Sequence, residues 1–290
     1  MPGKRLNGAS RVRRVHRLMG RGRVIAVTER PPILEFDDSR QAMIEPSGWF
    51  KPIDIAPVAV MTWMRDVVDG LLAEGRLVER HRFVAESAVH PIWEMEPERG
   101  QRERSVGERT VAVVLAPVGA PMAAALLEVL IALGCRQFVA VGSAGGLVED
   151  LPVGSVVVPN GAVRDEGVSY HYLAPDRLAR PDPDTQLRLK ETLERHDFSV
   201  SDGLVWTTDA IFRETRTKVE LRRAEGCVAI DMEAASLMSV AEFRGVPLAH
   251  AVYIADTLHG EEWDRTHLVR PGTSFRRRLF FATIEAAVTH

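Results

Sequence analysis

The 290-residue sequence contains few cysteines and no long hydrophobic run. Its two cysteines, Cys135 and Cys227, cannot build a disulfide framework, and neither has the spacing of a metal site. Both lie among apolar residues, which is typical of buried thiols and fits a reducing compartment. No stretch reaches the roughly 18 apolar residues of a membrane-spanning helix, and no apolar signal core follows the basic N-terminus. We therefore expect a cytoplasmic protein with no membrane partner.

Acidic residues are missing from residues 1–28, which carry eight lysines and arginines, whereas the whole chain has a net charge of −3. A basic arm can bind nucleic acid or an anionic surface, but this one lacks the interleaved aromatic residues of a single-strand binder. We expect residues 1–23 to be a disordered arm, with a subunit contact as the next reading and nucleic-acid binding as a distant third. Residues 24–290 would then form one folded domain.

The central part of the chain has the pattern of an α/β fold. Apolar residues make up 46% of the sequence and charged residues 27%, close to the averages of globular proteins that bury a sizeable core. Residues 110–118, 138–142 and 155–159 are β-branched apolar runs, as expected of strands buried on both faces. A helical pattern at 122–133 separates the first two, and a strand–helix–strand unit implies parallel pairing. The sequence predicts a single α/β domain with a mainly parallel, mixed central sheet flanked by helices.

Further elements alternate along the rest of the chain. We expect a short strand at 24–27, a helix or a strand plus a helix at 58–74, an exposed loop at 94–109 and a short loop at 143–147. Beyond these we expect strands at 203–209, 227–232 and 247–256, and helices at 184–197, 214–224, 233–245 and 274–288.

Polar residues and glycines gather where the predicted strands end. Catalytic residues of such sheets collect at the carboxyl ends of the strands. The ends carry Gly119, the Gly142–Gly146 cluster, Thr208 with Asp209, Met232 with Glu233, and Asp256. A glycine cluster lets a ligand approach the backbone closely, although glycine-rich turns after strands are also common without function.

Glu233 and Asp256 are more informative, because each is an acid that directly follows a buried strand. Glu233 could simply stabilise the positive end of its own helix. As an ionised carboxylate it could also accept hydrogen bonds from a pair of sugar hydroxyls. Asp256 could be an ordinary loop acid, or a general acid that protonates a ring nitrogen of a base.

Five motifs in order then resemble one family. The segments VGAPMAAALLEVLIALGCRQFVAVGSAGGL, VGSVVVPNGAVRDEGVSYHYL, TTDAIF, AIDMEAASLMSVAEFRGVP and IAD, within residues 110–290, closely resemble the nucleoside phosphorylase/nucleosidase superfamily. This superfamily includes purine nucleoside phosphorylases, uridine phosphorylases and methylthioadenosine-type nucleosidases. The resemblance implies a phosphorylase-like catalytic domain that cleaves the N-glycosidic bond of a nucleoside. It also implies that no metal and no organic cofactor is needed, inorganic phosphate being a co-substrate of a phosphorylase.

The resemblance also implies roles for individual residues. Glu233 would bind the ribose hydroxyls, and Asp256 would protonate the leaving base, which favours purines. The substrate-binding candidates are Met232, Ser143, Gly119, Gly142, Ala144, Thr208, Asp209, Ile211, Phe212 and His171. Either Ile211 or Phe212 would face the base. A satisfied surface or core histidine is the alternative reading of His171.

The sequence leaves the acceptor of the sugar open. The phosphorylases carry an arginine where this chain has Ala140, and its loss removes a bidentate phosphate ligand. Against this, residues 36–40 (FDDSR) resemble the family's phosphate loop. The candidate phosphate ligands are therefore Arg40, Ser143, Gly119 and Arg164. We expect phosphorolysis, with hydrolysis by water that Glu35 activates as the close alternative.

Two further expectations follow from the resemblance. The family assembles as dimers, trimers or hexamers, so we expect a homo-oligomer whose partner molecule is a small nucleoside. A competing class is a protein that binds a nucleoside or nucleotide without turnover. Retention of both Glu233 and Asp256 argues against it, because binding alone needs no proton donor at the base.

Overall fold

The computed structural model describes residues 30–95, 111–260, 262–264 and 272–288. The predicted basic arm at 1–23, the predicted strand at 24–27 and nearly all of the predicted loop at 94–109 lie outside these ranges. No helix within them is long and apolar enough to cross a membrane.

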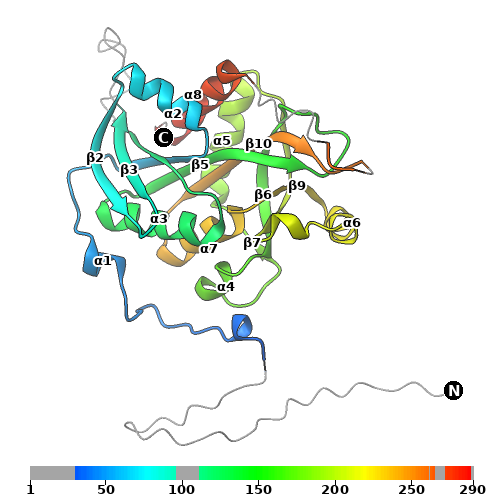
Figure 1. Ribbon diagram of the computed structural model, residues 1–290, viewed down its shortest axis with the longest axis horizontal. Helices are drawn as coiled ribbons and strands as arrows, with labels where there is room; N and C mark the ends of the chain where they lie inside the picture. Colours follow the sequence, from blue (N-terminus) through cyan, green and yellow to red (C-terminus); the bar gives the residue numbers. More distant parts are fainter. Residues whose placement is uncertain (1–29, 96–110, 261, 265–271, 289–290) are drawn as a thin grey trace, which may run out of the picture.

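Valine- and alanine-rich runs build one mixed sheet through the middle of the molecule (Figure 1). Its parallel ladders join β1 (Val58–Thr62), β4 (Val111–Leu115), β5 (Gln137–Gly146) and β10 (Leu248–Thr257), and then β6 (Val156–Asp165), β8 (Val200–Thr208) and β9 (Cys227–Asp231). Strand β10 pairs antiparallel with β6, while β9 reaches β5 through Gly145 and Gly146. Strands β5, β10, β6, β8 and β9 thus close into a ring.

A hairpin that the sequence analysis missed extends the sheet on the other side of β4. Strands β2 (Leu77–Val84) and β3 (Val89–Met95) pair antiparallel, and β3 pairs antiparallel with β4. Most of β2 is exposed and charged, so it lacks the continuous apolar run of a buried strand. A short strand, β7 (Leu178–Ala179), pairs with β6. The mixed α/β sheet that the sequence predicts is confirmed, with a larger antiparallel share than expected.

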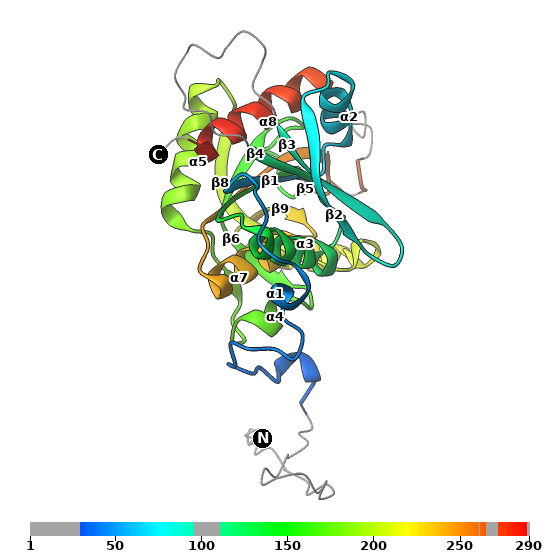
Figure 2. The ribbon, with the colours of Figure 1, turned by 90° about the vertical axis from the view of Figure 1, so that its left-hand side faces the viewer.

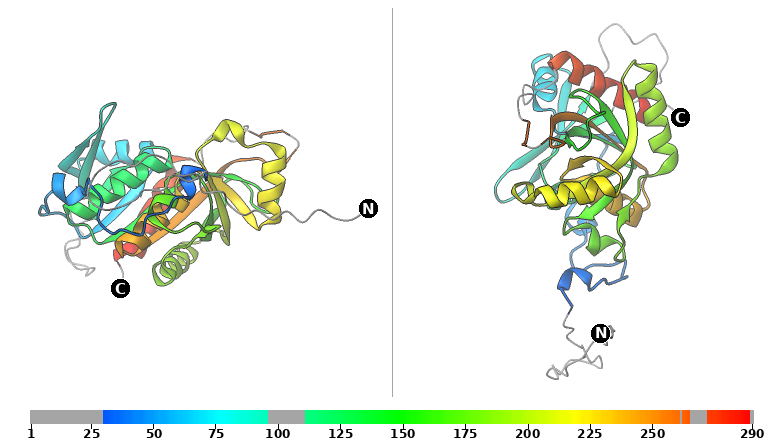
Figure 3. Two further views of the ribbon diagram at one scale, coloured as in Figure 1. Left: turned by 90° about the horizontal axis from the view of Figure 1, so that it is seen from below. Right: turned by 90° about the vertical axis from the view of Figure 1, so that its right-hand side faces the viewer.

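Helices cover both faces of the sheet (Figures 1 and 2). Helices α3 (Ala120–Leu133) and α7 (Ala234–Arg244) lie on one face, and α2 (Arg65–Ala73), α5 (Pro183–Arg195) and α8 (Thr273–Val288) on the other. Helix α6 (Arg216–Ala224) packs beside β9 at one end, which the views of Figure 3 show in yellow. Two short helices, α1 (Pro46–Trp49) and α4 (Ser169–Tyr172), and two 3₁₀ turns, η1 (Pro32–Leu34) and η2 (Ile211–Arg213), complete the described elements.

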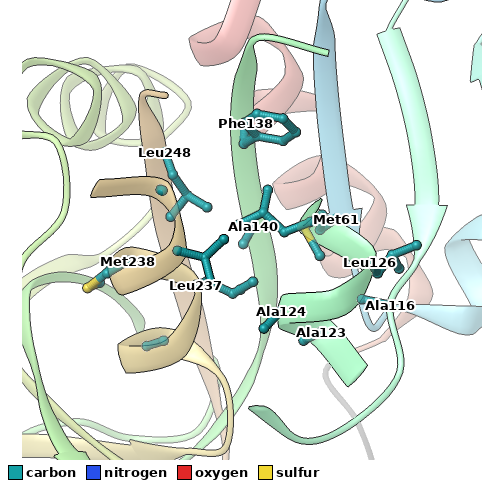
Figure 4. Close-up of a cluster of buried hydrophobic side chains, with 14 of the residues drawn as sticks. Met61, Ala116, Ala123, Ala124, Leu126, Phe138, Ala140, Leu237, Met238 and Leu248 are labelled. Atoms are coloured by element: carbon teal, nitrogen blue, oxygen red, sulfur yellow. The ribbon is translucent and has the colours of Figure 1, made fainter. Parts of the chain in front are cut away.

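The larger apolar core lies between the sheet and the helices α3 and α7. Phe138 and Ala140 of β5 are fully buried there, between Leu126 of α3 and Leu237 of α7 (Figure 4). Burial of this kind is the main free energy that holds a helix on a sheet. It fixes α7 and, with it, the residues at the start of that helix.

Two predicted boundaries are wrong in a way that matters for the site. Residues 143–146, predicted as part of a loop, continue strand β5, because Gly145 and Gly146 pair with both β9 and β10. The strand predicted at 155–159 extends to Asp165, since β8 pairs with it over its whole length. The region 58–74 is a strand followed by a helix, one of the two expected forms.

Candidate functional site

A cavity of about 330 Å³ lies where the carboxyl ends of β5, β9 and β10 meet. It gathers seven of the residues that the sequence singles out, from four separate segments of the chain. These are Gly142, Ser143, Ala144, Ile211, Met232, Glu233 and Asp256. Trp63, Glu214, Asp231 and His250 also line it, and the sequence analysis did not identify them.

Glycines on β5 form the floor of the cavity because larger residues would not fit. A Cβ on Gly142 would lie 2.9 Å from Cε3 of Trp63, and one on Gly145 would lie 2.7 Å from Cδ1 of Leu258. The indole of Trp63 is fixed by a 2.9 Å hydrogen bond from its Nε1 to the carbonyl oxygen of Pro117. The strand and the side chains above it therefore pack in direct contact.

Glu233 stands at the start of α7, is 8% exposed, and does not cap its own helix. Its carboxylate instead accepts a 2.5 Å hydrogen bond from the backbone N–H of Gly119 on the β4–α3 turn, a predicted site residue that does not itself line the cavity. Asp231 instead caps the start of α7: its Oδ2 accepts a 2.7 Å hydrogen bond from the backbone N–H of Ala234. The alternative reading of Glu233 as a helix-stabilising acid therefore applies better to Asp231.

The carboxyl groups of Asp231 and Glu233 are buried close together. Burial raises the pKa of both, and the charge of Asp231 raises that of Glu233 further. Hydrogen bonds act the other way: the Thr207 hydroxyl donates to Asp231 at 2.7 Å, and Gly119 donates to Glu233. A ligand that donates hydrogen bonds to such a buried carboxyl stabilises its ionised form and lowers its pKa again.

Asp256 faces the same cavity from the end of β10. The indole Nε1 of Trp263 donates a 2.5 Å hydrogen bond to its Oδ2, and partial burial raises its pKa. Glu214, on the segment between η2 and α6, also lines the cavity, and its side chain has no hydrogen-bond partner among the described residues. Burial and the nearby charge of Asp256 raise the pKa of Glu214 to about 7. The two carboxyls together therefore retain a proton up to neutral pH.

In the segment from β8 to η2, the structure distinguishes Ile211 from Phe212, the two residues that the sequence offered for contact with a base. Ile211 lines the cavity, whereas Phe212 is 95% exposed, so Ile211 is the one positioned to meet a base. Thr208 is buried and accepts from the N–H of Ala210 at 3.3 Å. Asp209 is exposed and accepts a 2.8 Å hydrogen bond from the N–H of Gly167, which ties this segment to the β6–α4 loop.

Arg40 and His171 do not reach this cavity within one chain. They line a second, larger cavity of about 570 Å³ between the N-terminal segment, α3, α4 and α7. There Arg40 donates to the carbonyl oxygen of Phe243, and its guanidinium lies 4.6 Å from the centre of that ring. Residues 36–40 precede α1 and the first described strand, β1, which is why they lie away from the strand ends.

Arg164 is buried in a structural role. Its guanidinium donates to the hydroxyl of Ser169 and to the carbonyl oxygens of Leu173 and Ala174, at 2.8 to 3.0 Å. Its guanidinium also stacks on the ring of Tyr170. These contacts hold α4 against β6, and the cavity at the strand ends is lined by other residues.

The described ionisable side chains that line the site cavity are mainly acidic. Among the described residues, its lining contains four carboxyl side chains, Glu214, Asp231, Glu233 and Asp256, and neither lysine nor arginine. Within the same residues no cluster of three or more His, Cys, Asp or Glu side chains is arranged to hold a metal ion. The site can therefore accept hydrogen bonds and donate protons, but by itself it offers no cation to an anionic ligand.

Comparison with known proteins gives consistent results. A model of the phosphorylase superfamily matches residues 79–277. The chain is 33% identical over 129 residues to guanosine phosphorylase of Halorubrum lacusprofundi, covering 44% of this chain and 54% of the relative. It is 34% identical over 105 residues to uridine phosphorylase of Treponema pallidum, covering 36% and 41%. The chain thus spans about half the length of these curated relatives.

The fold also matches solved structures. The crystal structure of AMP nucleosidase from Bacteroides thetaiotaomicron superposes with a TM-score of 0.60 at 19% identity, covering 81% of this chain and 88% of that one. At 19% identity, this structural similarity shows a shared fold.

Proposed function

Because this chain belongs to the phosphorylase superfamily, we propose that it is an enzyme that cleaves the N-glycosidic bond of a nucleoside and releases the free base. One observation carries the proposal. The buried carboxyl of Glu233 and the half-buried carboxyl of Asp256 face a single cavity from different walls, at the spot where the motifs of the family converge. A protein that only bound nucleosides would need no proton donor there.

The two carboxyls suit the two halves of the substrate. Glu233 accepts hydrogen bonds from ribose hydroxyls, which orients the sugar as positive charge develops on it. Asp256 donates a proton to the base, which carries the negative charge as the bond breaks. Ile211 and Met232 supply apolar contacts to base and sugar. Protonation at a ring nitrogen suits a purine, and we propose a purine nucleoside as the substrate class.

The names of the curated relatives favour phosphate as the acceptor of the sugar, with Ser143 as a hydroxyl donor in the cavity. The geometry of the described residues favours water instead. Phosphate would enter a cavity whose described lining holds four carboxyls and neither lysine nor arginine, so no positive side chain there would offset its charge. Ala140 is small and apolar at the position of the family arginine, and Trp63 fills the space beside Gly142. We therefore place hydrolysis first and phosphorolysis second.

A nucleoside panel assayed with and without inorganic phosphate tests both parts of the proposal. We expect base and free ribose from purine nucleosides at equal rates in both conditions. Base release that requires phosphate and yields ribose 1-phosphate would keep bond cleavage and replace water by phosphate. A cation from outside the described lining of this cavity would then have to bind the phosphate. Failure of every nucleoside to react would remove the proposal altogether.

Replacement of Glu214 by glutamine should change the pH dependence of turnover. A carboxyl whose pKa is raised to about 7 is protonated below that pH and ionised above it, so wild-type kcat/KM should fall as pH rises through about 7. In Glu214→Gln, Asp256 must hold the proton without a neighbouring negative charge, and this decline should move to lower pH. Profiles of kcat/KM from pH 5 to 9 measure it, with the exposed Glu220→Gln on α6 as control. Superimposable profiles for wild type and Glu214→Gln would contradict the shared proton.

The remaining parts of the proposal concern the whole molecule. The bond cleavage described needs no metal and no organic cofactor. A homo-oligomer in the cytoplasm remains a prediction. The exposed apolar side chains of Met43, Ile44 and Trp49 on the N-terminal segment are suited to a contact between copies. The partition into an arm at 1–23 and a catalytic domain at 24–290 is also a proposal.

A further inference from the structure

His250 is an unusual residue for the middle of a buried strand. It is 1% exposed, yet its imidazole lines the site cavity together with Val252, two residues along the same face of β10. Its Nδ1 has no hydrogen-bond partner among the described residues. A buried polar atom without a partner is costly, and the imidazole that carries it lines the cavity, so a ligand bound there is positioned to hydrogen-bond the ring.

The neighbours of His250 define one end of the cavity. Its ring stacks on the indole of Trp63, with the ring centres 6.5 Å apart and the planes 6° from parallel. On the paired strand, Ala140 lies in register with it, and Figure 4 shows that alanine turned into the apolar cluster between α3 and α7. The described neighbours of the imidazole are thus an aromatic ring and, on the paired strand, an alanine in register. None of these neighbours is charged, unlike the residues that carry the carboxyls.

The imidazole is itself uncharged at physiological pH, because burial lowers the pKa of His250 to about 4. It therefore offers one hydrogen-bond donor and one acceptor rather than a positive charge. Such a group suits a small neutral molecule better than a phosphate dianion. An ordered water needs two or more polar contacts, and Ser143, which lines the same cavity, is a second polar residue for it.

We propose that His250 binds the water molecule that attacks the sugar, at the end of the cavity beside Trp63. This inference rests on the proposed function with water as acceptor. Glu35, the candidate that the sequence offered for this task, follows η1 and is not part of the cavity lining.

The reaction balances with the groups at hand. The water oxygen forms a bond to C1′ of the ribose, and the C1′–N bond breaks with its electron pair going to the base. The carboxyl of Asp256 gives its proton to the base. The oxygen that has added to C1′ carries a positive charge and is a strong acid, so even a weak base such as this imidazole can take its proton. That proton returns through solvent to Asp256, and the products are free base and ribose.

The test compares His250→Gln and His250→Ala with wild type, with methanol as a second acceptor. We expect kcat to fall about a hundredfold in both variants with little change in nucleoside KM, the scale of a lost proton acceptor. His250→Ala should also widen the acceptor end and raise the ratio of methyl riboside to ribose. A merely structural defect would lower the rate without moving this ratio. His196→Ala, in which the lost imidazole pairs with Glu285 at the surface, is the control that should keep wild-type values.

The outcomes separate three claims: the role of His250, water as the acceptor of the sugar, and cleavage of the N-glycosidic bond. Wild-type rates and a wild-type product ratio in folded His250 variants would overturn the role of His250 while hydrolysis stands. A wild-type enzyme that depends on phosphate would overturn it together with water as acceptor, while bond cleavage stands. A wild-type protein that cleaves no nucleoside would overturn all three. Thermal unfolding of each variant identifies a folding defect, in which case His250→Gln, the less disruptive change, decides.

Discussion

Replacement of Glu233 by alanine is expected to lower kcat/KM for any nucleoside substrate by about a hundredfold to ten-thousandfold. Two hydrogen bonds from ribose hydroxyls to a charged carboxylate are each worth about 1.5–3 kcal/mol, and 1.4 kcal/mol corresponds to a factor of ten. Asp231, the other buried carboxyl of the lining, already accepts hydrogen bonds from Thr207 and Ala234, so we expect no replacement for Glu233 from it. Steady-state kinetics on purified protein measures the loss.

Glu233→Gln serves as the matched variant. Its amide oxygen can still accept from Gly119, so the turn stays anchored while the charge is lost. We expect it to lie between wild type and Glu233→Ala. Folded Glu233→Ala protein with wild-type kcat/KM would remove Glu233 from the sugar site and leave it a structural link between α7 and the β4–α3 turn.

Asp256→Asn should lower kcat for purine nucleosides by about a hundredfold to ten-thousandfold, the range found when a general acid is removed. The amide oxygen of asparagine can still accept the hydrogen bond from Trp263, so the geometry is retained while the proton is not. A riboside with a nitrophenol leaving group needs no protonation and should lose little. The measurement is the ratio of the two rates in each protein.

Equal losses on both substrates would speak against an acid at Asp256 and for a binding or structural role. An exposed acid offers the comparison: Asp202→Asn, whose carboxylate pairs only with Lys190 at the surface, should leave both rates unchanged.

The sequence predicts this site best where a residue of suitable chemistry also directly follows a recognisable strand. Glu233 and Asp256 each follow a buried strand, the place where catalytic residues of such sheets collect. Parallel pairing aligns the end of β10 with that of β5, whereas β9 reaches the same end of β5 through antiparallel pairs, which the sequence does not show. The glycine motif is recognised for the same reason, although its residues continue the strand instead of leaving it. Periodicity alone cannot show that, because the pairing partners of Gly145 and Gly146 are more than 80 residues away in the sequence.

The residues that sequence reasoning missed lie where local pattern carries no signal. His250 stands inside an apolar strand and reads as a core residue. Glu214 lies in a charged segment beside Arg213 and Arg216, and only the folded loop turns it towards Asp256. Arg40 shows the converse case, a motif match whose place in the fold is decided by the surrounding chain. In each case a contact between distant segments decides the role.

Strand β5 has a consequence for how such a site can change its substrate. Its Gly142–Gly146 stretch is held by ladders to β9 and β10 and is covered by Trp63 and Leu258 at contact distance. A side chain added there has no space, so this floor is fixed in shape. Residues 209–215 lie instead at the rim: six of the seven are exposed, and Asp209 is held by a hydrogen bond from Gly167. Selection for a new base, in nature or in the laboratory, should therefore accumulate substitutions in the rim and leave the floor unaltered.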